Sequence, residues 1–218
     1  MKNEKTRIGI MGGTFDPIHV GHLMIAENAL EQYHLDQVLF IPTGRSPHKD
    51  DRYIEQSAHR LEMLRLSVRD NPNFYMSAME INASGTSYTY LTLQKLKKRY
   101  PDWELYFIMG GDSLDYFDEW YHPEIICSIA TLLVAGRDDY NEGFLRNKIN
   151  RIEEKYGATI LPIDTLNMSI SSRNIRQRVF ENRTIRYLVP KDVEEYIDRR
   201  NLYKEFIVSN GSLAEKLL

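Results

Sequence analysis

Short runs of β-branched and aromatic residues recur along the 218-residue chain, and each is followed by a helical pattern or by a loop leading to one. In the helical segments apolar residues lie three and four positions apart, as at Leu61, Leu64 and Val68. This spacing places them on one face of a helix. The pattern predicts strands at Arg7–Met11, Gln37–Ile41, Phe74–Ser77, Glu104–Met109, Thr131–Ala135 and Thr159–Pro162. It predicts helices at Val20–Tyr33, Ser57–Arg69, Tyr88–Tyr100, Glu142–Tyr156, Ser172–Glu181 and Lys191–Arg199.

The alternation of strands and helices predicts a doubly wound α/β fold with a mainly parallel sheet, because right-handed crossovers between parallel strands place helices on both faces. Ligands then bind at the carboxyl ends of the strands. The chain shows no internal repeat, low-complexity segment or Gly/Ser linker, so we expect a single domain over residues 1–204. Residues 205–218 are interpreted as an extension, either docked on the surface or partly ordered, to which no role is assigned.

The hydrophobic stretches and the cysteine content indicate the cellular compartment in which the protein is expected. The longest apolar stretch, Ile125–Gly136, is interrupted by Ser128 and Thr131 and falls below the roughly 20 residues that a membrane helix needs. We interpret it as core. The apolar run near the N-terminus is too short for a signal peptide. Because Cys127 is the only cysteine, an internal disulfide and a thiolate metal cluster are excluded, and we expect a cytoplasmic protein with no membrane partner.

The net charge of the chain limits the kinds of binding partner that are expected. Lys and Arg number 28 against 31 Asp and Glu, which gives a net charge of −3. A surface with this balance does not attract a polyanion, so general nucleic-acid binding is not expected. Any phosphate chemistry must come from a few basic groups gathered in one cleft.

The strongest chemical signal is the string GGTFDPIHVGH at residues 12–22, which follows the first predicted strand and opens the first predicted helix. Glycines let the backbone approach a ligand closely, and a helix N-terminus offers amide donors and a positive dipole end to phosphate. His19 and His22 straddle Gly21, so both imidazoles can face one anion. The string matches neither the Walker pattern nor the dinucleotide fingerprint. The alternative is a simple turn with surface or metal-binding histidines, although no third ligand stands at a telling spacing.

Two further segments carry basic groups. The loop PTGRSPHK at residues 42–49 follows the second predicted strand and can supply Arg45, His48 and Lys49 to a polyphosphate. The alternative is a solvated proline-rich loop. Near the start of a late helix, Ser172 and Arg176 lie one turn apart, so a hydroxyl and a guanidinium can bind the same phosphates. The alternative is a serine N-cap followed by solvated arginines.

Polar and aromatic residues follow the fourth predicted strand. Asp112, in the string GGDSL, can accept hydrogen bonds from a ribose, and Trp120 can stack on a flat heteroaromatic ring. Taken alone, the two residues are better explained as an acidic N-cap and a core aromatic. The string TSYT at residues 86–89 precedes a helix and is explained either by capping or by a binding site.

Together these strings resemble the bacterial nicotinate-nucleotide adenylyltransferases, within the nucleotidyltransferase superfamily that shares a His-x-Gly-His element. The resemblance runs from Ile8 to Tyr203 and is narrowed by SYT at residues 87–89, by the GxDSL string, by Trp120 and Tyr121, and by ISS with IR at residues 170–176. It implies a Rossmann-like fold and transfer of AMP from ATP to nicotinate mononucleotide, giving nicotinate adenine dinucleotide and pyrophosphate.

The resemblance also implies roles for individual residues. Catalytic roles fall to His19, His22, Lys49 and Arg176. ATP-binding roles fall to Gly12, Gly13, Thr14, Phe15, Ser172 and Ile175. Nicotinate mononucleotide would be held by Thr89, Asp112, Trp120 and Tyr121. Mg²⁺ would arrive with ATP and need no metal site of the protein's own.

Some alternatives stay open at this stage. Arg173 stands where many relatives have Thr, and Gly111 where Ala is frequent. Rival functions are adenylylation of phosphopantetheine, transfer of a cytidylyl group, and nucleotide binding without catalysis. An NAD-dependent oxidoreductase does not fit the glycine spacing. The choice between nicotinate and nicotinamide is open, as is the oligomeric state, with a homo-oligomer as one possibility.

Overall fold

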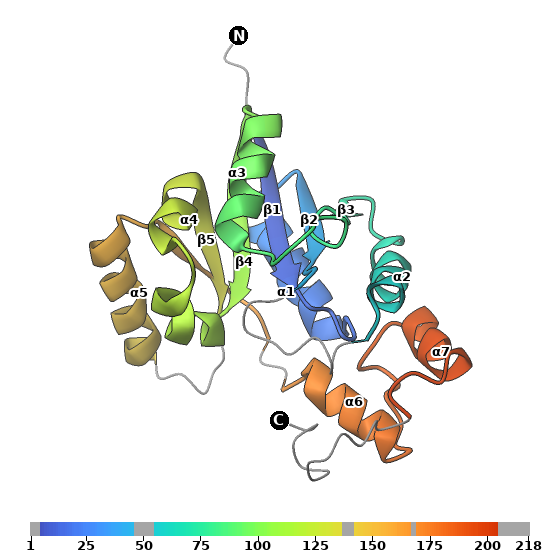
Figure 1. Ribbon diagram of the computed structural model, residues 1–218. Coiled ribbons are helices and arrows are strands. Elements are labelled where there is room, and N and C mark those ends of the chain that lie inside the picture. The colour runs from blue at the N-terminus through green and yellow to red at the C-terminus, as the bar shows by residue number, and fades with distance from the viewer. Residues whose placement is uncertain (1–4, 46–54, 137–141, 167–168, 205–218) are drawn as a thin grey trace.

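The computed structural model describes residues 5–45, 55–136, 142–166 and 169–204. Its centre is a six-stranded sheet in the order β3-β2-β1-β4-β5-β6, and every neighbouring pair of strands is parallel (Figure 1). The predicted parallel α/β fold is therefore confirmed. The strands are β1 (Thr6–Gly13), β2 (Gln37–Pro42), β3 (Phe74–Met76), β4 (Trp103–Gly110), β5 (Ala130–Ala135) and β6 (Ile160–Ile163).

The helices agree with the predicted periodicity except after β4. There the chain forms a 3-10 helix, η2, and then a short helix, α4, neither of which the sequence pattern predicted. The apolar stretch Ile125–Gly136 divides between α4 and β5, and its buried residues confirm the prediction of core. Pro123 opens α4 at a position where a missing amide donor is tolerated. The helices are α1 (Val20–Gln32), α2 (Ser57–Val68), α3 (Thr89–Arg99), η2 (Gly111–Glu119), α4 (Pro123–Ile129), α5 (Glu142–Tyr156), α6 (Ser172–Phe180) and α7 (Lys191–Arg199).

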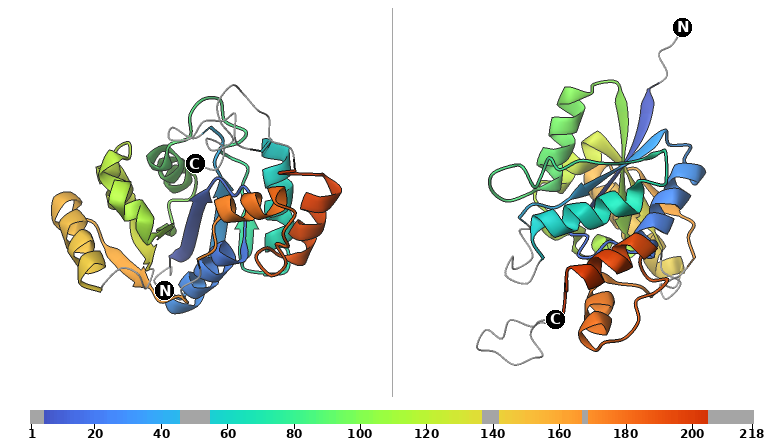
Figure 2. Two further views of the ribbon diagram at one scale, coloured as in Figure 1. Left: turned by 90° about the horizontal axis from the view of Figure 1, so that it is seen from below. Right: turned by 90° about the vertical axis from the view of Figure 1, so that its right-hand side faces the viewer.

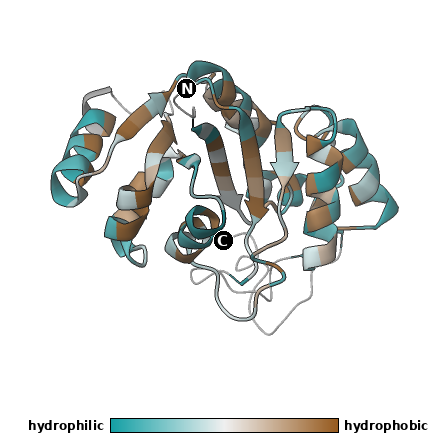
Figure 3. Ribbon diagram, turned by 90° about the horizontal axis from the view of Figure 1, so that it is seen from above, coloured by the Kyte–Doolittle hydropathy of each residue, from teal (hydrophilic) through white to brown (hydrophobic). Residues whose placement is uncertain are grey.

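Two hydrophobic clusters pack against the opposite faces of the sheet. Successive strand residues point to opposite faces, so Tyr106 and Ile108 belong to one cluster while Leu105 and Phe107 belong to the other. Residues of α1, α2, α6 and α7 complete the first cluster, and residues of α3, α4, α5 and η2 complete the second. The central strands are correspondingly apolar (Figure 3), and helices flank both faces (Figure 2). A single domain over residues 1–204 stays a prediction.

The direction of chain winding reverses between β1 and β4. From β1 the chain proceeds outward to β2 and β3, whereas β4, β5 and β6 continue on the other side. Ligands of such sheets bind at the carboxyl ends of the strands beside this reversal. The helices α6 and α7 lie beyond the same ends (Figure 1). No helix within the described ranges has both the length and the apolar character that crossing a bilayer requires.

Candidate functional site

The turn between β1 and α1 is anchored by a buried phenylalanine. Phe15 has a left-handed backbone (φ 50°), which is rare for a bulky residue. Its side chain is only 2% exposed and packs near Phe40, with 6.0 Å between ring centroids, and edge-on to His22 at 5.2 Å. The Cβ of a residue larger than glycine at position 13 would lie 3.0 Å from the Phe15 ring. The ring therefore fixes the path of the backbone beside Gly13.

The two histidines of the motif are adjacent, as predicted. His19 is the N-cap of α1 and is 7% exposed, and its ring stacks on that of His22 with centroids 3.7 Å apart. The backbone N–H of His19 donates to Nδ1 of His22 at 3.2 Å. Since Nδ1 of His22 accepts this hydrogen bond, a neutral His22 carries its proton on Nε2. The backbone thus sets the tautomer that carries the proton on Nε2.

The start of α1 differs from the expectation in one respect. The backbone N–H of Val20, the first residue of the helix, donates to the carbonyl of Leu188 at 3.0 Å. That amide is already bound within the protein, although the sequence suggested that the amides of this helix start would be available to phosphate. The interaction also joins the segment between α6 and α7 to the histidine motif.

A buried arginine connects the two loops that follow β1 and β2. Arg60 on α2 is 2% exposed. Its guanidinium donates to the carbonyl of Thr14 at 2.8 Å, to the carbonyl of Thr43 at 2.9 Å and to the carbonyl of Glu55 at 3.2 Å. Hydrogen bonds from a charged donor are stronger than neutral ones. Arg60 thereby holds the glycine-rich turn and the loop after β2 in a fixed relation.

Ser172 and Arg176 lie on one face of α6, as their spacing predicts, and both reach the turn after β1. The hydroxyl of Ser172 donates to the carbonyl of Pro17 at 2.8 Å, and Nη1 of Arg176 donates to the carbonyl of Asp16 at 2.6 Å. The neighbouring Ser171 is the N-cap and accepts from the backbone N–H of Asn174. The serine N-cap suggested as the alternative therefore exists, but at Ser171, which leaves Ser172 directed at the turn.

The loop after β2 pairs with the segment before α3. The N–H of Gly44 donates to Oγ of Ser87 at 3.2 Å, and the N–H of Ser87 donates to the carbonyl of Arg45 at 2.8 Å. A Cβ on Gly44 would come within 2.4 Å of the Glu80 carbonyl oxygen, so glycine is required for this approach. The Glu80 carboxylate accepts from the Thr92 hydroxyl at 2.6 Å, and burial raises the pKa of Glu80 above its ordinary value. These contacts tie the loop after β2 to the SYT string.

The residues predicted to hold the mononucleotide lie at the ends of η2 and at the start of α3. Tyr88 is the N-cap of α3, Thr89 is its first residue, and the ring of Tyr88 meets that of Tyr121 at 4.5 Å. Asp112 is exposed in the first turn of η2. Trp120 ends η2 and is half-buried. Its indole packs near Phe107 at 6.0 Å and Phe117 at 5.4 Å.

Side chains of α5 hold η2 in place through Asp118. The Asp118 carboxylate on η2 accepts from Nζ of Lys155 at 2.8 Å and from the Tyr156 hydroxyl at 2.7 Å, and Arg151 lies at 2.7 Å. The hydrogen bond from Lys155 is the main reason that the pKa of Asp118 is lowered. These contacts hold the turn that ends at Trp120.

Some predicted residues contribute in a restricted way or lie outside the described residues. Ile175 is fully buried in the first hydrophobic cluster, so any contact to ATP must come from its main chain. His48, Lys49 and residues 205–218 lie outside the described residues. The structure gathers His19, His22, Ser172 and Arg176 around one turn, but the ATP-binding and catalytic roles stay predictions. The same holds for the substrate-binding roles of Thr89, Asp112, Trp120 and Tyr121.

Comparisons with known proteins show the family to which the chain belongs. A family model described as cytidylyltransferase-like matches residues 10–178. A protein of Lachnoclostridium phytofermentans named "Probable nicotinate-nucleotide adenylyltransferase" is 44% identical over 197 residues, which cover 90% of this chain and 98% of that protein. A protein of Thermomicrobium roseum with the same name is 44% identical over 200 residues, covering 91% and 92%. The chain belongs to the nicotinate-nucleotide adenylyltransferase family.

Solved structures confirm the family's fold. The Plasmodium falciparum nicotinic acid mononucleotide adenylyltransferase complexed with NaAD superposes with a TM-score of 0.76 at 20% identity, over 93% of this chain and all of that chain (100%). The complex of the same enzyme with APC gives a TM-score of 0.74 with the same coverage and identity. At this identity the likeness concerns the fold alone, and it confirms the predicted Rossmann-like nucleotidyltransferase fold.

The sequence analysis did not single out several residues whose side chains hold the loops of the site through hydrogen bonds. Arg60, Glu80 and Tyr203 were not singled out, and Asp16 was part of the motif without a role. Arg60 had a usable signal, since it precedes Met63 and Leu64 by three and four positions and so stands on the apolar face of α2. A charged residue on such a face is rarely buried without partners.

Proposed function

We propose that this protein transfers the adenylyl group of ATP to nicotinate mononucleotide, forming nicotinate adenine dinucleotide and releasing pyrophosphate. The observation that carries the proposal is 44% identity, over nearly the whole length, to a protein named as a nicotinate-nucleotide adenylyltransferase. The geometry supports it, because the His19–His22 pair lies beside the topological reversal and the Trp120–Tyr121 pair follows the adjacent strand β4.

The reaction needs no covalent enzyme intermediate. A phosphate oxygen of the mononucleotide attacks the α-phosphorus of ATP in line, and the bond from that phosphorus to the oxygen bridging to the β-phosphate breaks. Pyrophosphate leaves with the electron pair. Catalysis of such a transfer rests on positioning and on neutralising charge on the phosphoryl oxygens. The Nε2–H of His22 is a preset donor for that purpose, and His19 supports it by stacking and through its backbone N–H.

The leaving pyrophosphate carries charge that must be balanced. We assign this task to Arg176, Lys49 and a Mg²⁺ ion bound to ATP. Magnesium often keeps its waters and binds through substrate phosphates. The carboxylate nearest in sequence to the histidines, Asp16, accepts hydrogen bonds from Tyr203 and from the N–H of Glu55. It is therefore engaged within the protein, which fits a metal that enters with the nucleotide.

One assay of pyrophosphate release tests the proposal. ATP is offered with nicotinate mononucleotide, nicotinamide mononucleotide or phosphopantetheine, and CTP replaces ATP in a parallel set. We expect release with ATP and nicotinate mononucleotide above every other pair, and a product with the mass of nicotinate adenine dinucleotide. Preference for phosphopantetheine or for CTP would refute the assignment. ATP binding without release with any acceptor would indicate a nucleotide-binding protein that does not catalyse.

A further inference from the structure

Asp16 joins three separate segments of the chain at the turn between β1 and α1. This turn, residues 14–19, is called the phosphate-side turn below, because the proposed function assigns ATP phosphate binding to it. Asp16 is 2% exposed. One carboxylate oxygen, Oδ1, accepts from the Tyr203 hydroxyl at 2.6 Å, and the other, Oδ2, accepts from the backbone N–H of Glu55 at 3.3 Å. Nη1 of Arg176 lies 3.9 Å from Oδ2 and donates to the Asp16 carbonyl at 2.6 Å. One buried residue thus fixes the C-terminal segment, the approach to α2 and the arginine of α6.

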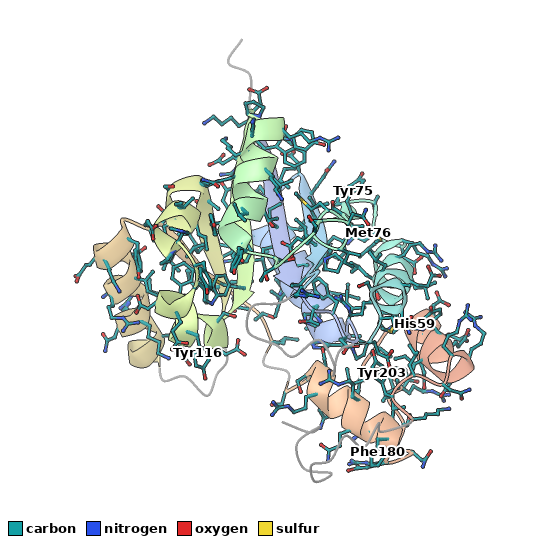
Figure 4. All side chains as sticks on the ribbon, viewed as in Figure 1. His59, Tyr75, Met76, Tyr116, Phe180 and Tyr203 are labelled. Atoms are coloured by element: carbon teal, nitrogen blue, oxygen red, sulfur yellow. The ribbon has the colours of Figure 1, made fainter. Side chains whose placement is uncertain are left out.

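Tyr203 is held in place for this contact. It has a left-handed backbone (φ 62°), as does Asn201 (φ 53°), a conformation that is unusual for residues other than glycine. Between them Leu202 is 5% exposed and belongs to the first hydrophobic cluster. Part of the tyrosine stays accessible, but its hydroxyl is deep, and burial raises the pKa of Tyr203 well above its ordinary value. Tyr203 lies beside α6 and α7 (Figure 4).

We propose that Tyr203 and Asp16 are positioning residues for ATP, with the Tyr203 hydroxyl fixing Asp16 so that the turn carrying His19 and the Arg176 guanidinium keep their relative places. The inference rests on the proposed function. Its contacts all lie on the phosphate side: Asp16 is three residues before His19, and its carbonyl is the acceptor of Arg176. The SYT string and the Trp120–Tyr121 pair are held by other contacts, through Glu80 and through Asp118. Loss of the Tyr203 hydroxyl should therefore affect ATP and spare the mononucleotide.

Tyr196 offers a matched control. It lies on α7, in the same C-terminal part of the chain, and is 6% exposed. Its hydroxyl lies 2.9 Å from Nδ1 of His59 on α2, and His59 and Tyr203 lie in the same region of the molecule (Figure 4). Tyr196→Phe and Tyr203→Phe each remove one hydroxyl from a bonded pair, but only Tyr203 contacts the phosphate-side turn. If the Tyr203 hydroxyl served only to stabilise the fold, the two variants would have the same kinetic constants for both substrates.

The test measures the Kd for ATP by calorimetry, KM values for both substrates, and the melting temperature of each variant. We expect Tyr203→Phe to raise the Kd and KM for ATP by roughly tenfold to a hundredfold, as for loss of a hydrogen bond to a charged group, with the KM for nicotinate mononucleotide unchanged. Tyr196→Phe should leave both substrates unaffected. Equal kinetic constants in the two tyrosine variants, or a parallel rise for both substrates of Tyr203→Phe, would overturn the proposal.

A double-mutant cycle with Asp16→Asn tests whether Tyr203 acts through Asp16. If it does, the double variant has an ATP Kd close to that of the more impaired single variant, whereas multiplying effects would overturn the proposed route. If Tyr203→Phe does not fold, Asp16→Asn alone decides the question through the same split between ATP and mononucleotide. Calorimetry with ATP separates this inference from the proposed function, since absence of pyrophosphate release in the wild type would refute the function while ATP binding still reports on the turn.

Discussion

Replacing Arg60 with methionine is expected to weaken both the fold and the binding of ATP. Methionine retains much of the volume of the arginine stem but donates no hydrogen bond. The carbonyls of Thr14, Thr43 and Glu55 would each lose a donor that now lies 2.8, 2.9 and 3.2 Å away, respectively. These carbonyls belong to the loops after β1 and β2 and to the approach to α2, so the change reaches the site without touching a residue that we assign to catalysis.

The magnitude follows from burial. A fully buried carbonyl left without its donor costs roughly 1–3 kcal/mol. These three carbonyls are partly buried, so roughly 3–9 kcal/mol is an upper bound for their sum. Removing a buried guanidinium also removes its desolvation penalty, which is several kcal/mol and acts in the opposite direction. We expect a net loss of about 3 kcal/mol in the free energy of unfolding. For a chain of this size, that corresponds to a fall of about 6–12 °C in melting temperature.

Calorimetry and steady-state kinetics check both parts. Arg65→Met is the matched control, because Arg65 lies on the same helix but pairs with Glu62 at the surface. It should leave the melting temperature and the kinetics nearly unchanged. At a temperature where both variants are folded, Arg60→Met should have the higher KM for ATP. A fall of less than about 2 °C would refute the energetic reasoning, and a large fall with unchanged kinetics would refute the role in positioning the loops.

Three further predictions concern separate groups. His22→Ala should fold and lose roughly 10²-fold or more in turnover, as for removal of one donor to a developing oxyanion; wild-type turnover in the purified variant would exclude the phosphate clamp. Burial raises the pKa of Glu80 above its ordinary value of 4.5, so its contribution to stability is present below pH 4.5 and is lost as the pH rises through the raised pKa. In urea unfolding, the stability of the wild type relative to Glu80→Gln should therefore fall as the pH rises above 4.5, and a constant difference would contradict this. Burial raises the pKa of Cys127 to about 11, so only about one thiol in a thousand is ionised at pH 8. A disulfide reagent should react with the native protein far more slowly than with the protein in urea, and equal rates would show that the thiol is accessible.

The motifs predicted the family through their resemblance to known proteins, and the hydrophobic periodicity predicted most of the strands and helices. The apolar spacing located the strands and the long helices, because each of them buries one face, and the residues on that face must be apolar at the period of the element. It failed at η2 and α4, since the chain between residues 111 and 129 is broken at His122, which has a left-handed backbone, and at Pro123. Each of the two short helices contains too few turns for a helical period to show. The string at residues 12–22 and the pair Ser172 and Arg176 were found because their chemistry is local.

What the sequence determined by itself is the order of elements and the local motifs of the site. The positioning network was decided by the tertiary structure alone, since its partners are distant in the chain: Tyr203 meets Asp16 across 187 positions, and Arg60 meets Thr14 across 46. Hydrogen bonds of this kind depend on where the doubly wound sheet brings loop ends together. No spacing rule within one segment records that, because the physical requirement is a buried polar group meeting its partner in space.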